Sequence, residues 1–143
     1  MKVQIATHES DFYLKALDLR RPILRLPLGL DFSEDDIAAE SNEICIVATE
    51  GNQVLGTLQI KPINETTVKI RQVAVHPDSQ GTGVGRAISE FAESWAMENG
   101  YSLITLNARV PAVPFYLRLD YEVVGDEFIE VSIPHLTMEK RLR

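Results

Sequence analysis

The sequence predicts an α/β (α+β) fold, in which a mixed, mostly antiparallel sheet of about seven strands is flanked by about four helices. Short segments rich in β-branched residues alternate with turn residues along most of the chain, as they do in a strand meander. One longer segment, 84–98, carries apolar residues at helical spacing between two such strands, which predicts a parallel crossover. Because 143 residues suit one domain, we expect a single domain over residues 1–143.

Turn and cap residues place the individual elements. Ser10 and Ser33 can cap helices that begin directly after them, and Asn99-Gly100 is a typical helix end. Pro111 suits the first turn of a short helix, whereas Pro22 disfavours a regular end to the first one. The expected strands are 2–6, 43–50, 53–61, 68–75, 102–108, 121–128 and 135–141.

Composition limits the classes of partner and site. The net charge of −7 argues against binding to nucleic acid, and it favours cationic partners unless it is only a solvated acidic surface. The single cysteine, Cys45, lies in an apolar run, where a buried structural thiol is expected rather than a nucleophile. No apolar stretch reaches membrane-spanning length and no secretion signal is recognised, so a cytoplasmic protein that binds no membrane is expected. No residue spacing suggests a metal site.

The most informative stretch joins the fourth expected strand to the long helix. After Pro77 has ended the strand, glycine stands at every second position, as Gly81, Gly83 and Gly85. The first turn of a helix has free N–H groups and partial positive charge, and glycines let an anion approach that backbone closely. We interpret the loop as a phosphate site, above all for a pyrophosphate, to which Gln80 and Arg86 could add donors. A flexible surface loop is the alternative.

The segment Gln80-Gly81-Thr82-Gly83-Val84-Gly85 has neither the lysine of a Walker loop nor the glycine spacing of a Rossmann loop. It resembles the signature Gln/Arg-x-x-Gly-x-Gly/Ala of the GNAT acyl-CoA N-acyltransferases. The resemblance implies that the loop amides hold the pyrophosphate of coenzyme A. The cofactor-binding residues implied here are Gln80, Gly81, Thr82, Gly83, Val84, Gly85 and Arg86.

A second segment, 112–121, is similar to the Ala-x-x-Phe-Tyr-x-x-x-Gly-Phe/Tyr segment of the same family. Asp120 replaces the usual glycine, and aspartate tolerates the left-handed turn better than most residues. The resemblance implies that Tyr116 is the catalytic acid for the leaving thiolate, that Phe115 contacts the cofactor, and that Asn107 bonds its pantetheine arm or a linking water. From the residues alone, Tyr116 could also be a packed tyrosine and Asn107 a polar strand residue.

The family polarises the thioester carbonyl with a backbone N–H before the glycine loop, here around Val73, Ala74 and Val75. This unbroken apolar run is compatible with a bulge that frees an amide, or with burial on both faces. No carboxylate stands on the strand as a general base. His76 is expected to be a turn residue, while His135 could be a structural histidine or a base, and water could carry the proton instead.

Together these motifs predict an N-acetyltransferase that moves an acetyl group from acetyl-CoA to a primary amine of a small molecule or protein, by direct attack in a ternary complex. The alternative is a non-catalytic acyl-CoA-binding regulatory module. The apolar segment Leu24–Leu30 is expected to lack regular structure, and from the residues alone it could be buried packing or a binding wall. The resemblance implies that this segment and the helix after it line the amine pocket, as the family's variable acceptor wall does. A homodimer is a possible assembly.

Overall fold

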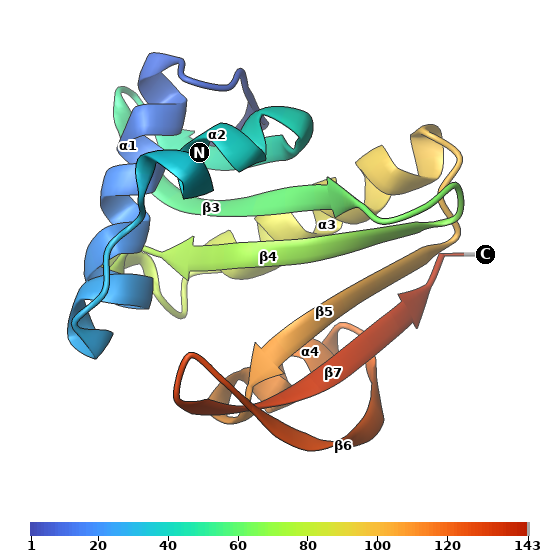
Figure 1. The fold of residues 1–143 in the computed structure, drawn as a ribbon. Coiled ribbons are helices and arrows are strands. Elements are labelled where there is room, and N and C mark those ends of the chain that lie inside the picture. The colour runs from blue at the N-terminus through green and yellow to red at the C-terminus, as the bar shows by residue number, and fades with distance from the viewer. Residues whose placement is uncertain (143) are drawn as a thin grey trace.

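The seven strands within residues 1–142 lie in one sheet, in the order β1-β2-β3-β4-β5-β7-β6 (Figure 1). The computed structural model describes residues 1–142, so Arg143, the last residue of the expected domain, lies outside the described residues. The strands are β1 (Lys2–Ala6), β2 (Ile44–Glu50), β3 (Gln53–Pro62), β4 (Thr67–Val75), β5 (Leu103–Arg109), β6 (Glu122–Glu130) and β7 (Ile133–Arg141). The helices are α1 (Asp11–Arg20), α2 (Glu34–Ala39), α3 (Val84–Glu98) and α4 (Val113–Arg118). The predicted fold class is confirmed.

The pairing of the strands explains how the chain crosses the sheet. Neighbouring strands are antiparallel except β4 and β5, which run parallel and are joined through α3 as the sequence predicts. The expected helix caps are also present. The side chain of Ser10 accepts a hydrogen bond from the Tyr13 amide at the start of α1, and Ser33 forms a reciprocal capping box with Asp36 at the start of α2.

Alternation along the strands gives the sheet two faces with separate cores. On one face, apolar residues of β2 to β5 and β7 pack against α3 and α4; Figure 1 shows α3 behind β3 and β4. On the other face, Cys45 and Val47 of β2 pack against Tyr13 and Ala16 of α1. The strand residues of this second core come from β1, β2 and β3. On the same face, β4 and β5 carry polar side chains such as Arg71 and Asn107.

β4 and β5 part before either strand ends. Their parallel pairing stops at Ile70 and Leu106, and Figure 1 shows the two arrowheads well separated although the strands begin side by side. On its other edge β4 carries a bulge, because Gln72 and Val73 together lie opposite Leu58 of β3. Gln72 takes up the bulge with a φ of 55°. Of the two alternatives that the sequence left open for this strand, the bulge is therefore present, and it begins one residue before the stretch 73–75.

The segment after α1 differs from the prediction. Residues Arg21–Arg25 continue as a π-helix and Leu26–Leu28 as a 3-10 helix, so most of the segment Leu24–Leu30 is helical rather than irregular. Pro22 lacks the N–H that an α-helix would need, and the chain instead closes a wider turn in which the Leu26 amide donates to the Arg21 carbonyl. Gly29, with a φ of 73°, ends the helical path.

The turn of the β6–β7 hairpin is shorter than expected, so β6 runs to Glu130 rather than to 128 and β7 begins at Ile133 rather than at 135. The turn consists of Val131 and Ser132, both with positive φ, of 46° and 64°. Hairpin turns of this kind normally contain Asn or Gly, and a β-branched residue in that conformation is strained. The strained turn lies at the edge of the cavity described next.

Candidate functional site

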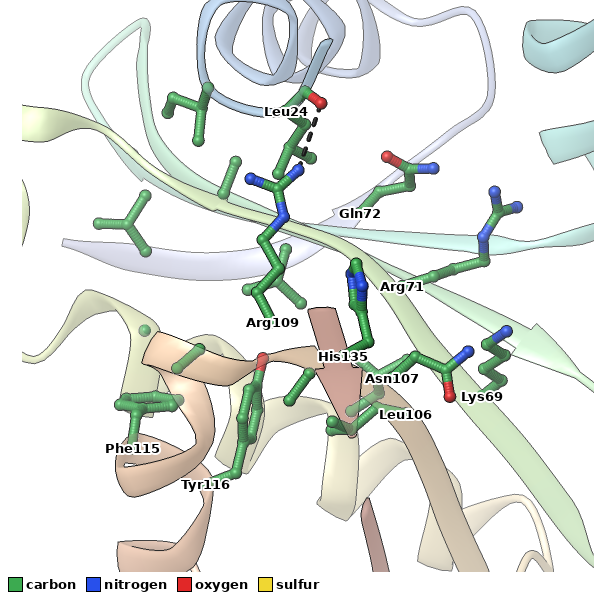
Figure 2. A pocket seen from close by; sticks show the side chains of 18 of the residues that line it. Leu24, Lys69, Arg71, Gln72, Leu106, Asn107, Arg109, Phe115, Tyr116 and His135 are labelled. Atoms are coloured by element: carbon green, nitrogen blue, oxygen red, sulfur yellow. Dashed lines mark hydrogen bonds between the residues drawn. The ribbon is translucent and has the colours of Figure 1, made fainter. Parts of the chain in front are cut away.

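A cavity of about 860 Å³ lies where β4 and β5 part. Its wall includes Gly83, Gly85 and Phe115 from the α3 and α4 side of the sheet, and Arg109 and His135 from the opposite side. The cavity therefore passes through the sheet instead of lying on one face. Figure 2 shows its central part, with Phe115 and Tyr116 below the strands and Arg109 and His135 nearer to the segment that carries Leu24.

The glycine loop forms one end of this cavity. Gly81 and Gly83 have φ values of 78° and 93°, and the space beside each is open. Gly83 is the N-cap of α3 without a side-chain cap, and the first helical hydrogen bond runs from the Ala87 amide to the Gly83 carbonyl. The first-turn amides are therefore left for a ligand at the positive end of the helix dipole, as the sequence predicts for an anion.

Close packing fixes the position of this helix end. A Cβ on Gly85 would lie 3.3 Å from Phe115 Cζ, a tight contact that the Phe115 ring could relieve only by shifting slightly. A Cβ on Gly56 of β3 would lie 2.6 Å from Val84 Cγ1, which is closer than real contacts allow. Gln80 Nε2 donates to the Val75 carbonyl at 3.3 Å, which ties the loop back to β4.

Most of the residues predicted for the site border the cavity. Thr82 and Val84 are exceptions: the Thr82 hydroxyl donates to the Ser79 carbonyl, and the Val84 side chain is buried in the core. Their predicted contribution through backbone amides stays a prediction. The predicted residues that border the cavity are Val73, Ala74, Val75, Gln80, Gly81, Gly83, Gly85, Arg86, Asn107, Phe115 and Tyr116.

Tyr116 is buried, but its hydroxyl points into the cavity (Figure 2). Its ring packs edge-on against Phe115 and Tyr121, with centroids 5.0 and 5.5 Å away. Burial raises the pKa of the Tyr116 phenol to about 12, so the group carries its proton at neutral pH. Within residues 1–142 its hydroxyl makes no hydrogen bond, which leaves it able to donate to a ligand.

Asn107 already has polar partners on both sides of its amide. Its Oδ1 accepts from the Thr137 hydroxyl at 3.0 Å, and its Nδ2 donates to Glu130 Oε2 at 3.2 Å. Glu130 fixes the orientation of the amide, because a carboxylate oxygen only accepts hydrogen bonds and must therefore face the Nδ2 donor. The second N–H of Nδ2 is the donor that a cofactor arm or water could use.

His135 borders the cavity and is only 4% exposed. Its ring stacks on Phe128 with centroids 5.9 Å apart, and Nδ1 lies 2.7 Å from the Ile133 carbonyl oxygen. A carbonyl oxygen can only accept, so Nδ1 carries the hydrogen and Nε2 of the neutral ring keeps a lone pair. His135 thus makes a structural hydrogen bond and also presents a proton acceptor at the cavity wall, so both roles that the sequence left open are compatible with its position. His76 instead accepts from the Asp78 amide at a turn, as expected.

The structure adds three arginines that were not predicted for the site. Arg25, Arg71 and Arg109 border the part of the cavity that faces away from α3. Arg109 could have been anticipated, since strand alternation places it on the same face as Asn107. Arg25 could not, because it arrives through the π-helix that follows Pro22. Leu24 also borders the cavity, whereas Leu26, Leu28 and Leu30 do not, so only the start of the expected acceptor wall is present.

A family model, the acetyltransferase (GNAT) domain, matches residues 31–142, which is most of the chain. The chain belongs to the GNAT acetyltransferase family. YjcF of Bacillus subtilis (strain 168), named an uncharacterized N-acetyltransferase, is similar: the two are 29% identical over 141 residues, covering 98% of this chain and 99% of YjcF.

Solved structures show the same fold at lower identity. An acyl-CoA N-acyltransferase from Pseudomonas aeruginosa superposes with a TM-score of 0.81 at 21% identity, over 97% of this chain and 98% of that one. An aminoglycoside 6'-N-acetyltransferase complexed with coenzyme A superposes with a TM-score of 0.84 at 14% identity, over 100% and 98%. The family resemblance seen in the sequence is confirmed.

This GNAT acetyltransferase is therefore an acyltransferase, and the expected acetyl-CoA fits its family. The family identification favours the enzyme over the regulatory module that the sequence left open. Cys45 does not border the cavity; it is 3% exposed, and its thiol lies 3.7 Å from the Thr57 hydroxyl. Burial raises the pKa of the Cys45 thiol to about 11, which matches the predicted structural role.

In residues 1–142, His, Cys, Asp and Glu side chains do not gather in groups of three or more that could hold a metal ion. None of the helices described is both long and apolar enough to cross a membrane.

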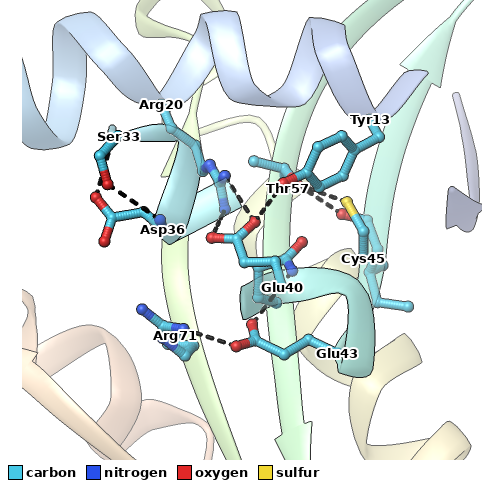
Figure 3. A network of polar contacts seen from close by, with 11 residues as sticks. Tyr13, Arg20, Ser33, Asp36, Glu40, Glu43, Cys45, Thr57 and Arg71 are labelled. Atoms are coloured by element: carbon cyan, nitrogen blue, oxygen red, sulfur yellow. Dashed lines mark hydrogen bonds and ion pairs between the residues drawn. The ribbon is translucent and has the colours of Figure 1, made fainter. Parts of the chain in front are cut away.

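A buried ion pair supports the wall that carries Arg25. Arg20 and Glu40 are 1% and 2% exposed, and both guanidinium Nη atoms donate to the carboxylate, at 2.9 and 3.2 Å (Figure 3). The Tyr13 hydroxyl donates to the same carboxylate at 2.7 Å, and burial raises the pKa of this phenol. Phe32 lies against both arginines, with its ring 4.7 Å from Arg20 Cζ and 4.6 Å from Arg25 Cζ. The pair thereby joins α1 to the segment after α2, and Phe32 connects it to Arg25 in the cavity wall.

We expect Glu40→Gln to destabilise the enzyme by about 3–5 kcal/mol, because the change leaves the buried Arg20 guanidinium without its counter-charge. Chemical denaturation of parent and variant measures the loss. Glu98→Gln, an exposed change on α3, is the control and should stay within about 0.5 kcal/mol of the parent. Equal midpoints for Glu40→Gln and the parent would show that the ion pair does not hold the two segments together.

We expect Gly83→Asp to weaken coenzyme A binding on the order of 10-fold relative to Gly83→Asn. Both side chains have the same shape and tolerate a positive φ, so only the added negative charge beside the α3 amides differs between them. Calorimetric titration with coenzyme A measures the two affinities. Equal affinities for the Asp and Asn variants, with both folded, would argue against an anion at this helix end.

Proposed function

We propose that this GNAT acetyltransferase moves an acetyl group from acetyl-CoA to a primary amine by direct attack within a ternary complex. The observation that carries the proposal is a cavity that begins at the α3 N-terminus, passes between β4 and β5, and reaches a tyrosine hydroxyl and a histidine ring. A phosphate-bearing thioester and an amine can meet there from opposite faces of the sheet. The neighbour solved with coenzyme A supports the choice of cofactor.

The cofactor end of the proposal rests on free backbone donors. The pyrophosphate would lie on the first-turn amides of α3, with Gln80 and Arg86 beside the loop. Beyond Ile70, β4 loses its partner β5 while its backbone still borders the cavity. The amide-bearing arm of coenzyme A would pair with this edge as a short extra strand, which satisfies polar groups of both molecules.

The thioester carbonyl would then lie beside the bulge of β4. A bulge breaks the regular ladder, so an amide of residues 73–75 can turn toward a ligand instead of toward β3. One such N–H polarises the carbonyl and stabilises the negative charge that its oxygen gains when the amine attacks. Binding both reactants in one cavity supplies the orientation that this attack needs.

Two side chains would handle the protons. His135 Nε2, held as an acceptor by the Nδ1 hydrogen bond, takes a proton from the attacking amine directly or through a water. The Tyr116 hydroxyl donates to the departing sulfur. The thiolate would form in the same water-poor environment that keeps Tyr116 protonated, and that environment raises the basicity of the thiolate as well.

Direct transfer is supported by the location of Cys45. An acyl-enzyme needs a nucleophile at the thioester, and this thiol is enclosed in the α1-side core with a raised pKa. A histidine acceptor and a tyrosine donor that border one cavity are what amine acylation needs. A binding module would need neither of them.

We expect Tyr116→Phe to lower kcat by about 10²-fold while the affinity for acetyl-CoA stays close to that of the parent, because the hydroxyl acts mainly in the transition state. Stopped-flow or steady-state thiol release measures the change. Tyr121→Phe is a matched control: it removes a buried hydroxyl that has no partner among residues 1–142, from a ring 5.5 Å away that does not border the cavity. Equal losses in both variants would assign Tyr116 a structural role.

We expect His135→Gln to lower kcat by about 10²-fold or more with little change in the melting temperature, because glutamine is polar but accepts no proton near neutral pH. Added imidazole should restore part of the activity by supplying the acceptor from solution. Thiol release with and without imidazole measures the rescue. A folded His135→Gln enzyme with the turnover of the parent would transfer the acceptor role to water.

A further inference from the structure

The acceptor side of the cavity is basic although the chain as a whole carries a net charge of −7. Alternation along β4 and β5 points Lys69, Arg71 and Arg109 away from the α3-side core, onto the face where α1 and the π-helix lie. Arg25 reaches the same region from the π-helix. Within the described chain, Glu130 is the sole carboxylate residue of the whole cavity wall. An acidic protein thus has a basic pocket.

Two of these arginines have no carboxylate partner within residues 1–142. Arg71 is paired, because Glu43 Oε2 lies 2.7 Å from its Nη1. Arg25 Nη1 and Arg109 Nη2 instead donate to the same atom, the carbonyl oxygen of Leu24, at 3.2 and 3.3 Å. Figure 2 shows Arg109 reaching up to that carbonyl.

The neutral side chain of Gln72 lies between the guanidinium groups of Arg25 and Arg71. With its amide oriented so that the oxygen faces them, Gln72 Oε1 accepts from Arg25 Nη2 and from Arg71 Nη2, each at 3.0 Å. Three guanidinium groups therefore share two neutral oxygens, the Leu24 carbonyl and the Gln72 amide. A carboxylate in place of the amide would have neutralised the group.

The crowding of positive charges mainly affects the pKa of Arg25. Burial lowers the pKa of Arg25, and the charges of Arg109, Arg20 and Arg71 lower it further, against an opposing effect of Asp36. Phe32 holds the guanidinium in place by lying 4.6 Å from it. A rigid, partly buried cation that neighbouring cations repel gains free energy when an anion binds, and guanidinium groups bind carboxylates and phosphates through paired hydrogen bonds.

The cations also lie close to the proposed chemistry. Arg109 is paired with His135 across β5 and β7, and it follows Asn107 on the same face of β5. An anion held between Arg25 and Arg109 is therefore next to the histidine that would accept the proton of the amine. One acceptor molecule can reach both places only if it carries an amine and an anion.

We propose that the acceptor is a small amine that also carries an anionic group, a carboxylate or a phosphate, which binds to Arg25 and Arg109 while its amine faces His135. This inference rests on the proposed acetyl transfer. It excludes a polycationic acceptor, which the same arginines would repel.

A panel of short amines that differ in charge tests the inference. With acetyl-CoA in excess, kcat/KM is measured for three classes of acceptor, named by the charge of the group that accompanies the amine. β-Alanine and O-phosphoethanolamine are the anionic acceptors, glycinamide and ethanolamine are the neutral ones, and a lysine-rich peptide is the cationic one. We expect at least one anionic acceptor to exceed every neutral and cationic acceptor by on the order of 10-fold or more. The better of the two anionic acceptors identifies carboxylate or phosphate as the group.

Variants then connect the preference to its residues. Arg25→Gln and Arg109→Gln should each raise KM for the anionic acceptor on the order of 10-fold and change the values for neutral amines little. Gln72→Glu keeps the size of the side chain and supplies an internal carboxylate, so it should reduce the anionic preference as well. Arg141→Gln is the matched control: it also removes one positive charge, but at an exposed position on β7 outside the cavity, so it should leave the preference unchanged.

Failure of this inference differs from failure of the proposed function. If neutral or cationic amines are acetylated as well as the anionic ones, or if both arginine variants keep the preference, the inference is wrong while acetyl transfer stands. If no amine of any charge releases coenzyme A from an enzyme that binds acetyl-CoA, the proposed function fails and the inference fails with it.

Discussion

The separation of β4 from β5 is the constraint on which the site depends. The two strands run parallel, are joined through α3, and lie side by side as far as Ile70 and Leu106. The bulge at Gln72 then bends β4, and each strand is left with an edge that has no partner across the gap. Unpaired backbone at the centre of a sheet is costly unless something polar fills the opening. The fold thus creates a place for an extended, amide-bearing ligand.

The protein carries a net negative charge, but positively charged side chains predominate in the wall of its cavity. Net charge describes solubility and long-range attraction, whereas recognition depends on the few groups that border a cavity. The net charge of −7 was open to two interpretations, cationic partners or only a solvated acidic surface, and neither of them predicts the basic cavity wall. The buried carboxylate of Glu40 neutralises Arg20, which leaves Arg25 on the other side of Phe32 free to face the cavity.

Local signals in the sequence predicted the elements and the glycine loop that borders the cavity, because those depend on contiguous residues. The glycine loop, the caps at Ser10 and Ser33 and the left-handed turn at Asp120, with a φ of 69°, are all set by neighbours in the chain. The acceptor end was missed because it is assembled from distant segments. Arg25 comes from a π-helix that no local pattern marks, and the Val131-Ser132 turn lacks the Asn or Gly that would have identified it.

A passage through the sheet also bears on the order of events in a catalytic cycle. Exposed Gly81 and Arg86 border the cavity on the α3 side of the sheet, and exposed Lys61 and Glu130 border it on the opposite side. If cofactor and acceptor each approach from their own side, neither substrate has to wait for the other to leave a shared entrance. The two products can then depart by separate routes, so that slow release of one product need not block entry of the next acceptor.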